Sequence, residues 1–301
     1  PNNYVRSLIY AFHLPLFFLV SGILHKYNSQ IQLKKYAKTM LVPSLFYSIL
    51  FFIPASLALY LGYLPAKSHL IDSGMLSTFV NNFVFMTEKV FLGTDFYNGP
   101  CWFLVALFYC KIFTDMVEKN RAVGFFLWLI LFVCLTLNGY RYLFVAQATM
   151  AMPFYYIGFH FKEEIFKMMS TRINPMVHVV LMGVFAFVVY KLKVTSMLGV
   201  YFGRGTMAYT VPLFYLNAFI GSFLVLKFST LFKKESVVSK TAYSLLSILG
   251  LQSFFTIVCR KIGLYDMNYV ATLFVALAIY VLCHIGHKII VRYMPIALGK
   301  F

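Results

Sequence analysis

The sequence predicts an all-α protein, a polytopic bundle of transmembrane helices, and its composition carries this prediction. Hydrophobic residues make up 61% of the 301-residue chain and charged residues only 12%. Ordinary globular domains are about half apolar and about a quarter charged. The mean hydropathy is +0.80. Such a composition excludes a soluble enzyme, a disordered chain and a collagen-like fibre.

Long apolar stretches mark the expected spans, because a helix needs about 20 mostly apolar residues to cross the hydrocarbon core. Five long uncharged stretches are predicted to span at 39–66, 122–140, 142–161, 205–226 and 241–259. Four shorter or histidine-bearing stretches are predicted to span at 7–24, 100–117, 176–190 and 269–291. The apolar range 76–93 is interrupted by Asn81, Asn82, Glu88 and Lys89, so we expect an interfacial helix there. No linker or repeat interrupts the nine predicted spans, which indicates one domain over residues 1–301.

The charge distribution predicts the orientation of these spans. The chain has 26 Lys and Arg against 9 Asp and Glu, a net charge of +17. The basic residues stand in short clusters between apolar runs, which is typical of cytoplasmic loops beside anionic lipid and does not indicate nucleic-acid binding. Fifteen of them fall on one side of the predicted spans and eight on the other. The richer side is predicted to be cytoplasmic, with the C-terminus inside and Pro1 outside, and we therefore expect a further helix before Pro1.

His13 is the first candidate for chemistry, because ionisable residues inside a span are costly and often functional. It lies six residues into the first predicted span, and Pro15 beside it cannot donate a backbone hydrogen bond. A histidine at this depth can serve as a general base. The alternative is a buried neutral histidine that bonds to a neighbouring helix.

Lys35 and Lys38 form the second candidate site. They are spaced i, i+3 at the start of the second predicted span and share one helix face, where they could hold phosphate groups. The alternative is ordinary cytoplasmic flank charge.

Other polar residues give weaker indications. His284 and His287 are also spaced i, i+3, but no acidic residue is near them in sequence and the five cysteines lack metal-ligand spacing, so no metal site is predicted. Ser21 is too far along the helix from His13 for a Ser–His pair, which argues against a hydrolase.

Several stretches together resemble the integral-membrane acyltransferases of acyltransferase family three, in the branch of sugar O-acetylases similar to fucose 4-O-acetylase. FHLPLFFLVSGIL at 12–24 is similar to that branch's FHMPLFFFISG segment. KKYAKTMLVPSLFY, GPCWFLVALF, PFYYIG, PLFYLNAFIG and GLQS resemble later segments in the same order. The family has ten core helices, so the nine spans indicate a domain that is N-terminally incomplete. Arg260 stands where the family often has a histidine, and Gln252 replaces an asparagine.

The resemblance implies an enzyme, an acyltransferase that transfers groups other than amino-acyl groups. It assigns His13 to the catalytic centre and Lys35 and Lys38 to the phosphates of coenzyme A, with acetyl-CoA or another acyl-CoA as donor and no permanently bound cofactor. The acceptor is then a hydroxyl of a cell-surface or lipid-linked sugar, and the location is the bacterial inner membrane. Residues expected to contact the sugar or its lipid phosphate are Arg6, Trp102, Arg141 and Arg204.

Two alternatives from other classes stay open. One is a transporter or flippase for a polar lipid or sugar. Transporters often contain two related halves, and the sequence shows no such repeat, which argues against this alternative. The other is a non-catalytic membrane subunit, which should show no protection of the Lys35–Lys38 region by acyl-CoA.

Overall fold

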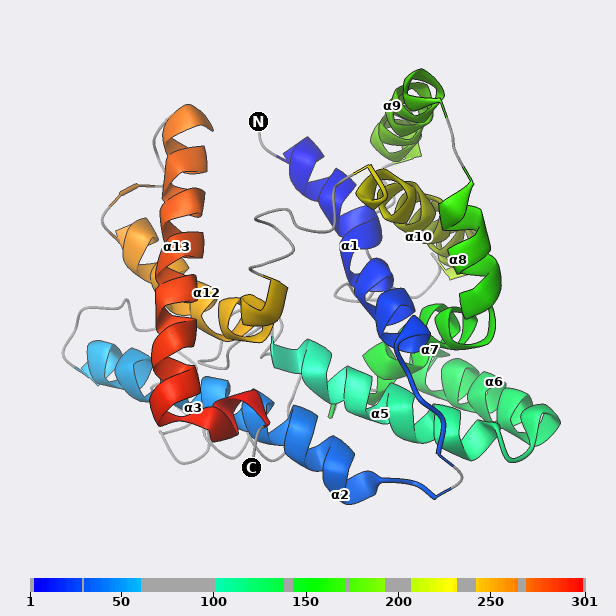
Figure 1. Ribbon diagram of the computed structural model, residues 1–301, viewed down its shortest axis with the longest axis horizontal. Coiled ribbons are helices and arrows are strands. Elements are labelled where there is room, and N and C mark those ends of the chain that lie inside the picture. Colours follow the sequence, from blue (N-terminus) through cyan, green and yellow to red (C-terminus); the bar gives the residue numbers. More distant parts are fainter. Residues whose placement is uncertain are drawn as a thin grey trace. The chain divides into compact units, whose positions relative to one another are not determined.

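The computed structural model describes residues 3–28, 30–60, 101–137, 143–171, 174–192, 207–231, 242–261, 263–264 and 269–299. Every regular element within these ranges is a helix, and the predicted all-α class is therefore confirmed for the described chain (Figure 1). The expected interfacial helix at 76–93 lies outside the described residues.

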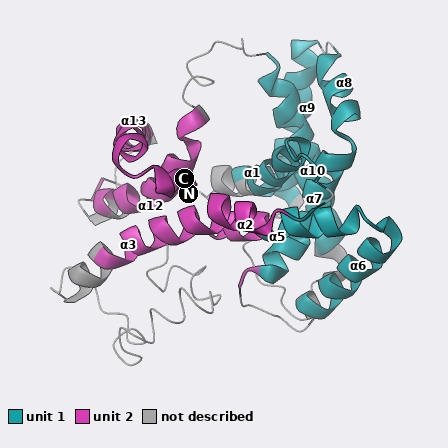
Figure 2. Ribbon diagram, turned by 60° about the horizontal axis from the view of Figure 1, so that its bottom comes forward, with its two compact units in different colours: residues 1–31, 109–140, 145–234 teal, residues 32–108, 141–144, 235–301 magenta. Residues whose placement is uncertain are grey.

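The helices gather into two compact units that alternate along the sequence (Figure 2). Unit 1 consists of residues 1–31, 109–140 and 145–234, and unit 2 of residues 32–108, 141–144 and 235–301. Helix α5 (Trp102–Val117) contributes its first residues to unit 2 and its later ones to unit 1.

Unit 1 is organised around α1 (Asn3–Ile23), which packs most extensively against α7 (Val145–His160) and then against α10 (Met207–Ser229). The remaining helices of the unit are α6 (Arg121–Leu137), α8 (Lys162–Ser170) and α9 (Pro175–Leu192).

Two glycines let the backbones of α1 and α7 touch. A Cβ at Gly22 would collide with the carbonyl of Tyr155, and a Cβ at Gly158 would collide with the carbonyl of Leu19. Small residues at a helix crossing are typical of membrane bundles, where close backbone packing replaces the hydrophobic effect between helices. At these two glycines, α1 and α7 therefore cross with their backbones in direct contact.

The charged residues at the two ends of the short helix α8 suit the helix dipole. Glu163 and Glu164 lie in its first turn and Lys167 in its last, which suits the positive and negative ends of a helix. The ammonium group of Lys227, near the end of α10, donates to the carbonyls of Met168 at 2.7 Å and Met169 at 3.0 Å, and also contacts the carbonyl of Thr171. A buried lysine therefore caps α8 and ties it to α10.

Unit 2 begins with one continuous helical segment of three parts, α2 (Leu33–Tyr36), the π-helical turn η1 (Ala37–Leu41) and α3 (Val42–Tyr60). It also contains the 3₁₀ turn η6 (Ala242–Ser244), α12 (Leu245–Lys261), α13 (Tyr269–Tyr293) and the C-terminal 3₁₀ turn η7 (Pro295–Leu298). Within the unit, α12 packs against α13 and α3, and η7 packs against α3 and α13.

Each of the nine ranges predicted to span the membrane overlaps a described helix. Among the described residues, three helical stretches are long and apolar enough to cross a bilayer: Leu33–Ile53 with 21 residues, Val211–Ser229 with 19 and Ala271–Tyr293 with 23. Shorter apolar helices cover Ala11–Ile23, Arg121–Leu135, Pro175–Lys191 and Leu245–Thr256. These lengths indicate a membrane protein, and the full number of nine crossings stays a prediction.

Candidate functional site

His13 makes a hydrogen bond within its own helix, and this bond defines which ring nitrogen carries the proton. The imidazole Nδ1 lies 2.9 Å from the backbone carbonyl of Ile9, one turn earlier in α1. A carbonyl can only accept, so Nδ1 carries the proton and donates it. In the neutral ring the acceptor lone pair is then on Nε2, the nitrogen farther from the helix backbone.

His13 lies on the less buried face of α1. Ile9 and Phe17, one turn before and one turn after it, are 46% and 38% exposed, whereas Ala11 and Leu19 on the opposite face are buried. Pro15 is inside the helix one turn after Ala11, whose carbonyl it cannot bond. A half-buried imidazole among apolar neighbours is costly against lipid, so the ring itself is a candidate for contact with a polar group.

Lys35 and Lys38 flank the start of the π-helical turn η1, and both are exposed. A π turn holds one residue more than an α-helical turn, is rare, and often marks a functional site. The hydroxyl of Thr39, inside the turn, donates to the carbonyls of Lys35 at 3.0 Å and Tyr36 at 3.3 Å. The two lysines therefore lie on a locally irregular backbone, where the Thr39 hydroxyl supplies hydrogen bonds to two carbonyls.

His13 belongs to unit 1, whereas Lys35 and Lys38 belong to unit 2. The resemblance thus places the catalytic base and the phosphate-binding lysines in different units, and their meeting in one site stays a prediction.

The four residues expected to bind the acceptor differ in what the structure describes of them. Trp102 begins α5, is buried, and its ring lies 6.2 Å from the ring of Phe144. Arg6 lies on α1, where its helical backbone alone is described. Arg141 and Arg204 lie outside the described residues.

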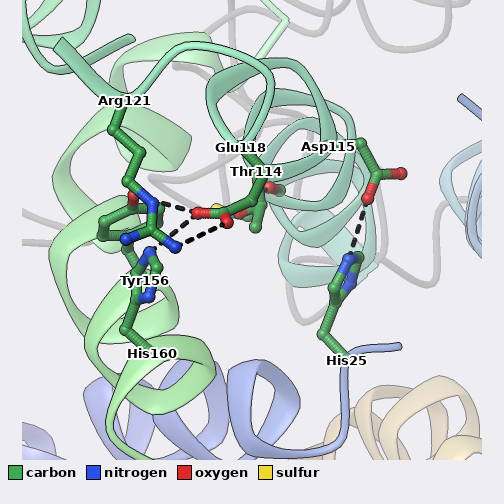
Figure 3. Close-up of polar contacts among 8 residues, drawn as sticks. His25, Thr114, Asp115, Glu118, Arg121, Tyr156 and His160 are labelled. Atoms are coloured by element: carbon green, nitrogen blue, oxygen red, sulfur yellow. Dashed lines mark hydrogen bonds and ion pairs between the residues drawn. The ribbon is translucent and has the colours of Figure 1, made fainter. Parts of the chain in front are cut away.

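A buried polar relay that we did not expect from the sequence joins three helix ends in unit 1. The Nε2–H of His25, just after α1, donates to the carboxylate of Asp115 on α5 at 3.0 Å (Figure 3). The hydroxyl of Tyr155 on α7 donates to Nδ1 of the same ring at 2.7 Å. All three side chains are buried. Burial lowers the pKa of His25 below 6.5, although Asp115 favours the protonated ring.

A second polar group lies beside this relay and is centred on Glu118, one turn after Asp115 (Figure 3). Its carboxylate contacts Nε2 of His160 at 2.7 Å, accepts from the hydroxyl of Tyr156 at 3.1 Å, and pairs with Arg121 at 3.4 Å. We call the seven residues of the relay and this group the helix-end cluster. The signal for it in the sequence is the pair Asp115 and Glu118, two of only nine acidic residues, at the end of an apolar helix.

Unit 2 holds a counterpart whose described members are hydroxyl and imidazole groups. The hydroxyl of Tyr47 on α3 donates to Ser247 on α12 at 3.3 Å, and the Ser247 hydroxyl lies 2.8 Å from Nδ1 of His287 on α13. One turn earlier on α13, His284 lies 3.3 Å from the hydroxyl of Ser244. The two histidines that the sequence singled out as a spaced pair are thus each matched with a serine. Among the described residues, no group of three His, Cys, Asp or Glu side chains is placed to hold a metal.

Comparison with known proteins identified no similar protein. No protein-family model, no curated protein and no solved structure matches the chain.

Proposed function

We propose that the protein is a membrane O-acyltransferase that moves an acyl group, most simply acetyl, from cytoplasmic acyl-CoA to a hydroxyl of a cell-surface or lipid-linked sugar. The observation that carries this proposal is the state of His13. Its Nδ1 is held by the Ile9 carbonyl, so Nε2 is the basic nitrogen of a partly accessible ring within an apolar helix. The resemblance of residues 12–24 to the sugar O-acetylases supports the same role.

The reaction needs one base and an anchored donor. Nε2 of His13 removes the proton of the sugar hydroxyl, and the oxygen attacks the thioester carbon of acyl-CoA. The tetrahedral intermediate collapses with loss of the C–S bond, and the coenzyme A sulfur takes the proton from the imidazolium. Lys35 and Lys38 hold the phosphates of the donor, because exposed ammonium groups bind phosphate as point charges.

Exposed apolar side chains support the embedding of the shorter helices in lipid as well. On α6, Phe125, Phe126 and Ile130 are exposed, and on α9 Val180 and Phe187 are exposed. Large exposed apolar patches are rare on soluble monomers and mark contacts with a membrane or another protein. We therefore propose nine crossings in the bacterial inner membrane, with the C-terminus on the cytoplasmic side as the Lys and Arg distribution predicts.

The test is transfer of labelled acetyl from acetyl-CoA to glycan in membranes that contain the full-length protein. We expect transfer by the wild type and a loss of at least about a hundredfold in His13→Gln, because general-base catalysis contributes on that order. His284→Gln, a half-buried histidine of unit 2, is the matched control and should keep its activity. Unchanged transfer in His13→Gln would contradict the catalytic role.

A transporter for a polar lipid or sugar is the second candidate, and one observation favours it. The helices α1, α7 and α10 each contain an internal proline, Pro15, Pro153 and Pro212, and interrupted helices are typical of transporters. Uptake or flipping of a labelled lipid-linked sugar by proteoliposomes without acetyl-CoA would support this candidate. Transfer of label without such movement would support the acyltransferase. The absence of both transfer and movement would favour a non-catalytic subunit.

A further inference from the structure

The C-terminal turn of unit 2 lies directly on the backbone that carries the lysine pair. The 3₁₀ turn η7 packs against α3, and Ala297 within it is fully buried. The turn ends at Gly299, whose φ of +67° is left-handed and whose N–H donates to the carbonyl of Ile296 at 3.0 Å. Residues 295–299 therefore form a defined structure with one buried face.

Gly299 allows this turn to approach Lys38 and Thr39. A Cβ at position 299 would lie 2.7 Å from the Cα of Thr39 and 3.2 Å from the carbonyl oxygen of Lys38. Both atoms belong to backbone, which cannot rotate out of the way as the end of a side chain can. Any side chain at 299 therefore has to push η7 and the π turn apart.

The π turn makes this contact matter for Lys35 and Lys38. If η1 rewound from π-helical to α-helical geometry, the preceding helix α2 would rotate by about 100° relative to α3. Such a rotation would carry Lys35 to another side of the helix. A turn that supports η1 from outside thus determines where the two ammonium groups point.

We infer that the C-terminal turn, residues 295–299, is a positioning element of the lysine-pair site, and that Gly299 lets it hold the π turn in the geometry that binds the phosphate groups of acyl-CoA. This inference rests on the proposed function in that it takes coenzyme A as the anion. It adds to that proposal a part of the chain that lies more than 250 residues from the lysines in sequence.

The chain contains a matched control for the substitution. Gly263, also in unit 2, has a φ of +76°, but a Cβ there would meet nothing within 4 Å. Gly263→Ala therefore has the backbone strain of Gly299→Ala without its collision. Asn tolerates a left-handed φ better than Ala, so Gly299→Asn keeps the collision and reduces the strain.

The experiment measures binding of coenzyme A to the full-length protein in nanodiscs by titration calorimetry, with the thermal unfolding midpoint of each variant recorded. We expect the Kd to rise about tenfold or more in Gly299→Ala and Gly299→Asn, since displaced charges bind phosphate poorly, and to stay unchanged in Gly263→Ala and Gly263→Asn. Because Gly299 acts through Lys35 and Lys38 together, the triple variant Lys35→Ala/Lys38→Ala/Gly299→Ala should bind no more weakly than Lys35→Ala/Lys38→Ala.

Three results would overturn the inference while leaving the proposed function standing. They are wild-type affinity in both Gly299 variants, a further loss in the triple variant beyond that of Lys35→Ala/Lys38→Ala, and failure of both Gly299 variants to fold while the Gly263 variants fold. If the wild type itself does not bind coenzyme A, the proposed function fails and the inference fails with it.

Discussion

Units 1 and 2 hold their helices together by different means. In unit 1, α1 and α7 touch backbone to backbone at Gly22 and Gly158, and a carboxylate lies in the buried relay at the helix ends. In unit 2, the glycine of α13 that faces α12 meets a side chain, the methyl Cδ1 of Leu251, and the described relay between helices consists of hydroxyl and imidazole groups. Unit 1 should therefore tolerate substitution less well at the crossing of α1 and α7 than unit 2 does where α12 meets α13, and the relay of His25 should give unit 1 a dependence on pH.

The largest expected effect is at the helix crossings. Gly22→Ala should destabilise the protein by about 3 kcal/mol or prevent folding, because the added methyl collides with the carbonyl of Tyr155. Gly286→Ala should change stability by no more than about 1 kcal/mol, because its methyl meets Leu251 Cδ1 at 2.7 Å and that side chain can move. Thermal unfolding in detergent compares the two, and equal effects would remove the distinction between the units.

An intermediate effect is expected from acid. The pKa of His25 is lowered by burial, so below pH 6.5 the unfolded chain binds a proton that the folded chain resists. The contribution of His25 to stability is complete above pH 6.5 and is lost as pH falls from there towards the folded pKa. The unfolding midpoint of the wild type should therefore fall more between pH 7.5 and pH 5.5 than that of His25→Gln. An identical fall in both would show that His25 does not carry this dependence.

The smallest effect is expected in the hydroxyl–imidazole relay of unit 2. Ser247→Ala removes the hydroxyl that links Tyr47 to His287, and it should cost about 1 kcal/mol, which is the scale of polar contacts between membrane helices. Tyr47→Phe removes one end of the same relay and serves as a second measurement by thermal unfolding. A loss in either variant as large as that of Gly22→Ala would show that unit 2 depends on this relay as unit 1 depends on its crossing.

The sequence predicted the helices better than it predicted their contacts. Each of the nine apolar stretches predicted to span overlaps a described helix, because hydrophobic length is a local property of the chain. The helix-end cluster was missed because its partners are far apart in sequence: His25 lies 90 residues from Asp115 and 130 from Tyr155. His25 and His160 stand at the ends of predicted spans, where the hydropathy pattern does not set them apart, and both contact carboxylates in the fold.

For the candidate site, residue type and spacing singled out His13, Lys35 and Lys38. The tautomer of His13 and the backbone geometry around the two lysines come from the structure. The bond from His13 to the Ile9 carbonyl and the π turn that contains Lys38 depend on backbone geometry that hydropathy does not report. The contact of Gly299 with Thr39 joins the two ends of unit 2, and no local pattern predicts it.

The most direct test of the central claim is the stoichiometry of the reaction with purified full-length protein in nanodiscs, acetyl-CoA and a lipid-linked sugar. The gain of acetyl by the sugar, read by mass spectrometry, should match the free thiol of coenzyme A mole for mole in the wild type. Both should be lost together in His13→Gln. Release of thiol without acetylated sugar, or full acetylation by His13→Gln, would contradict the account.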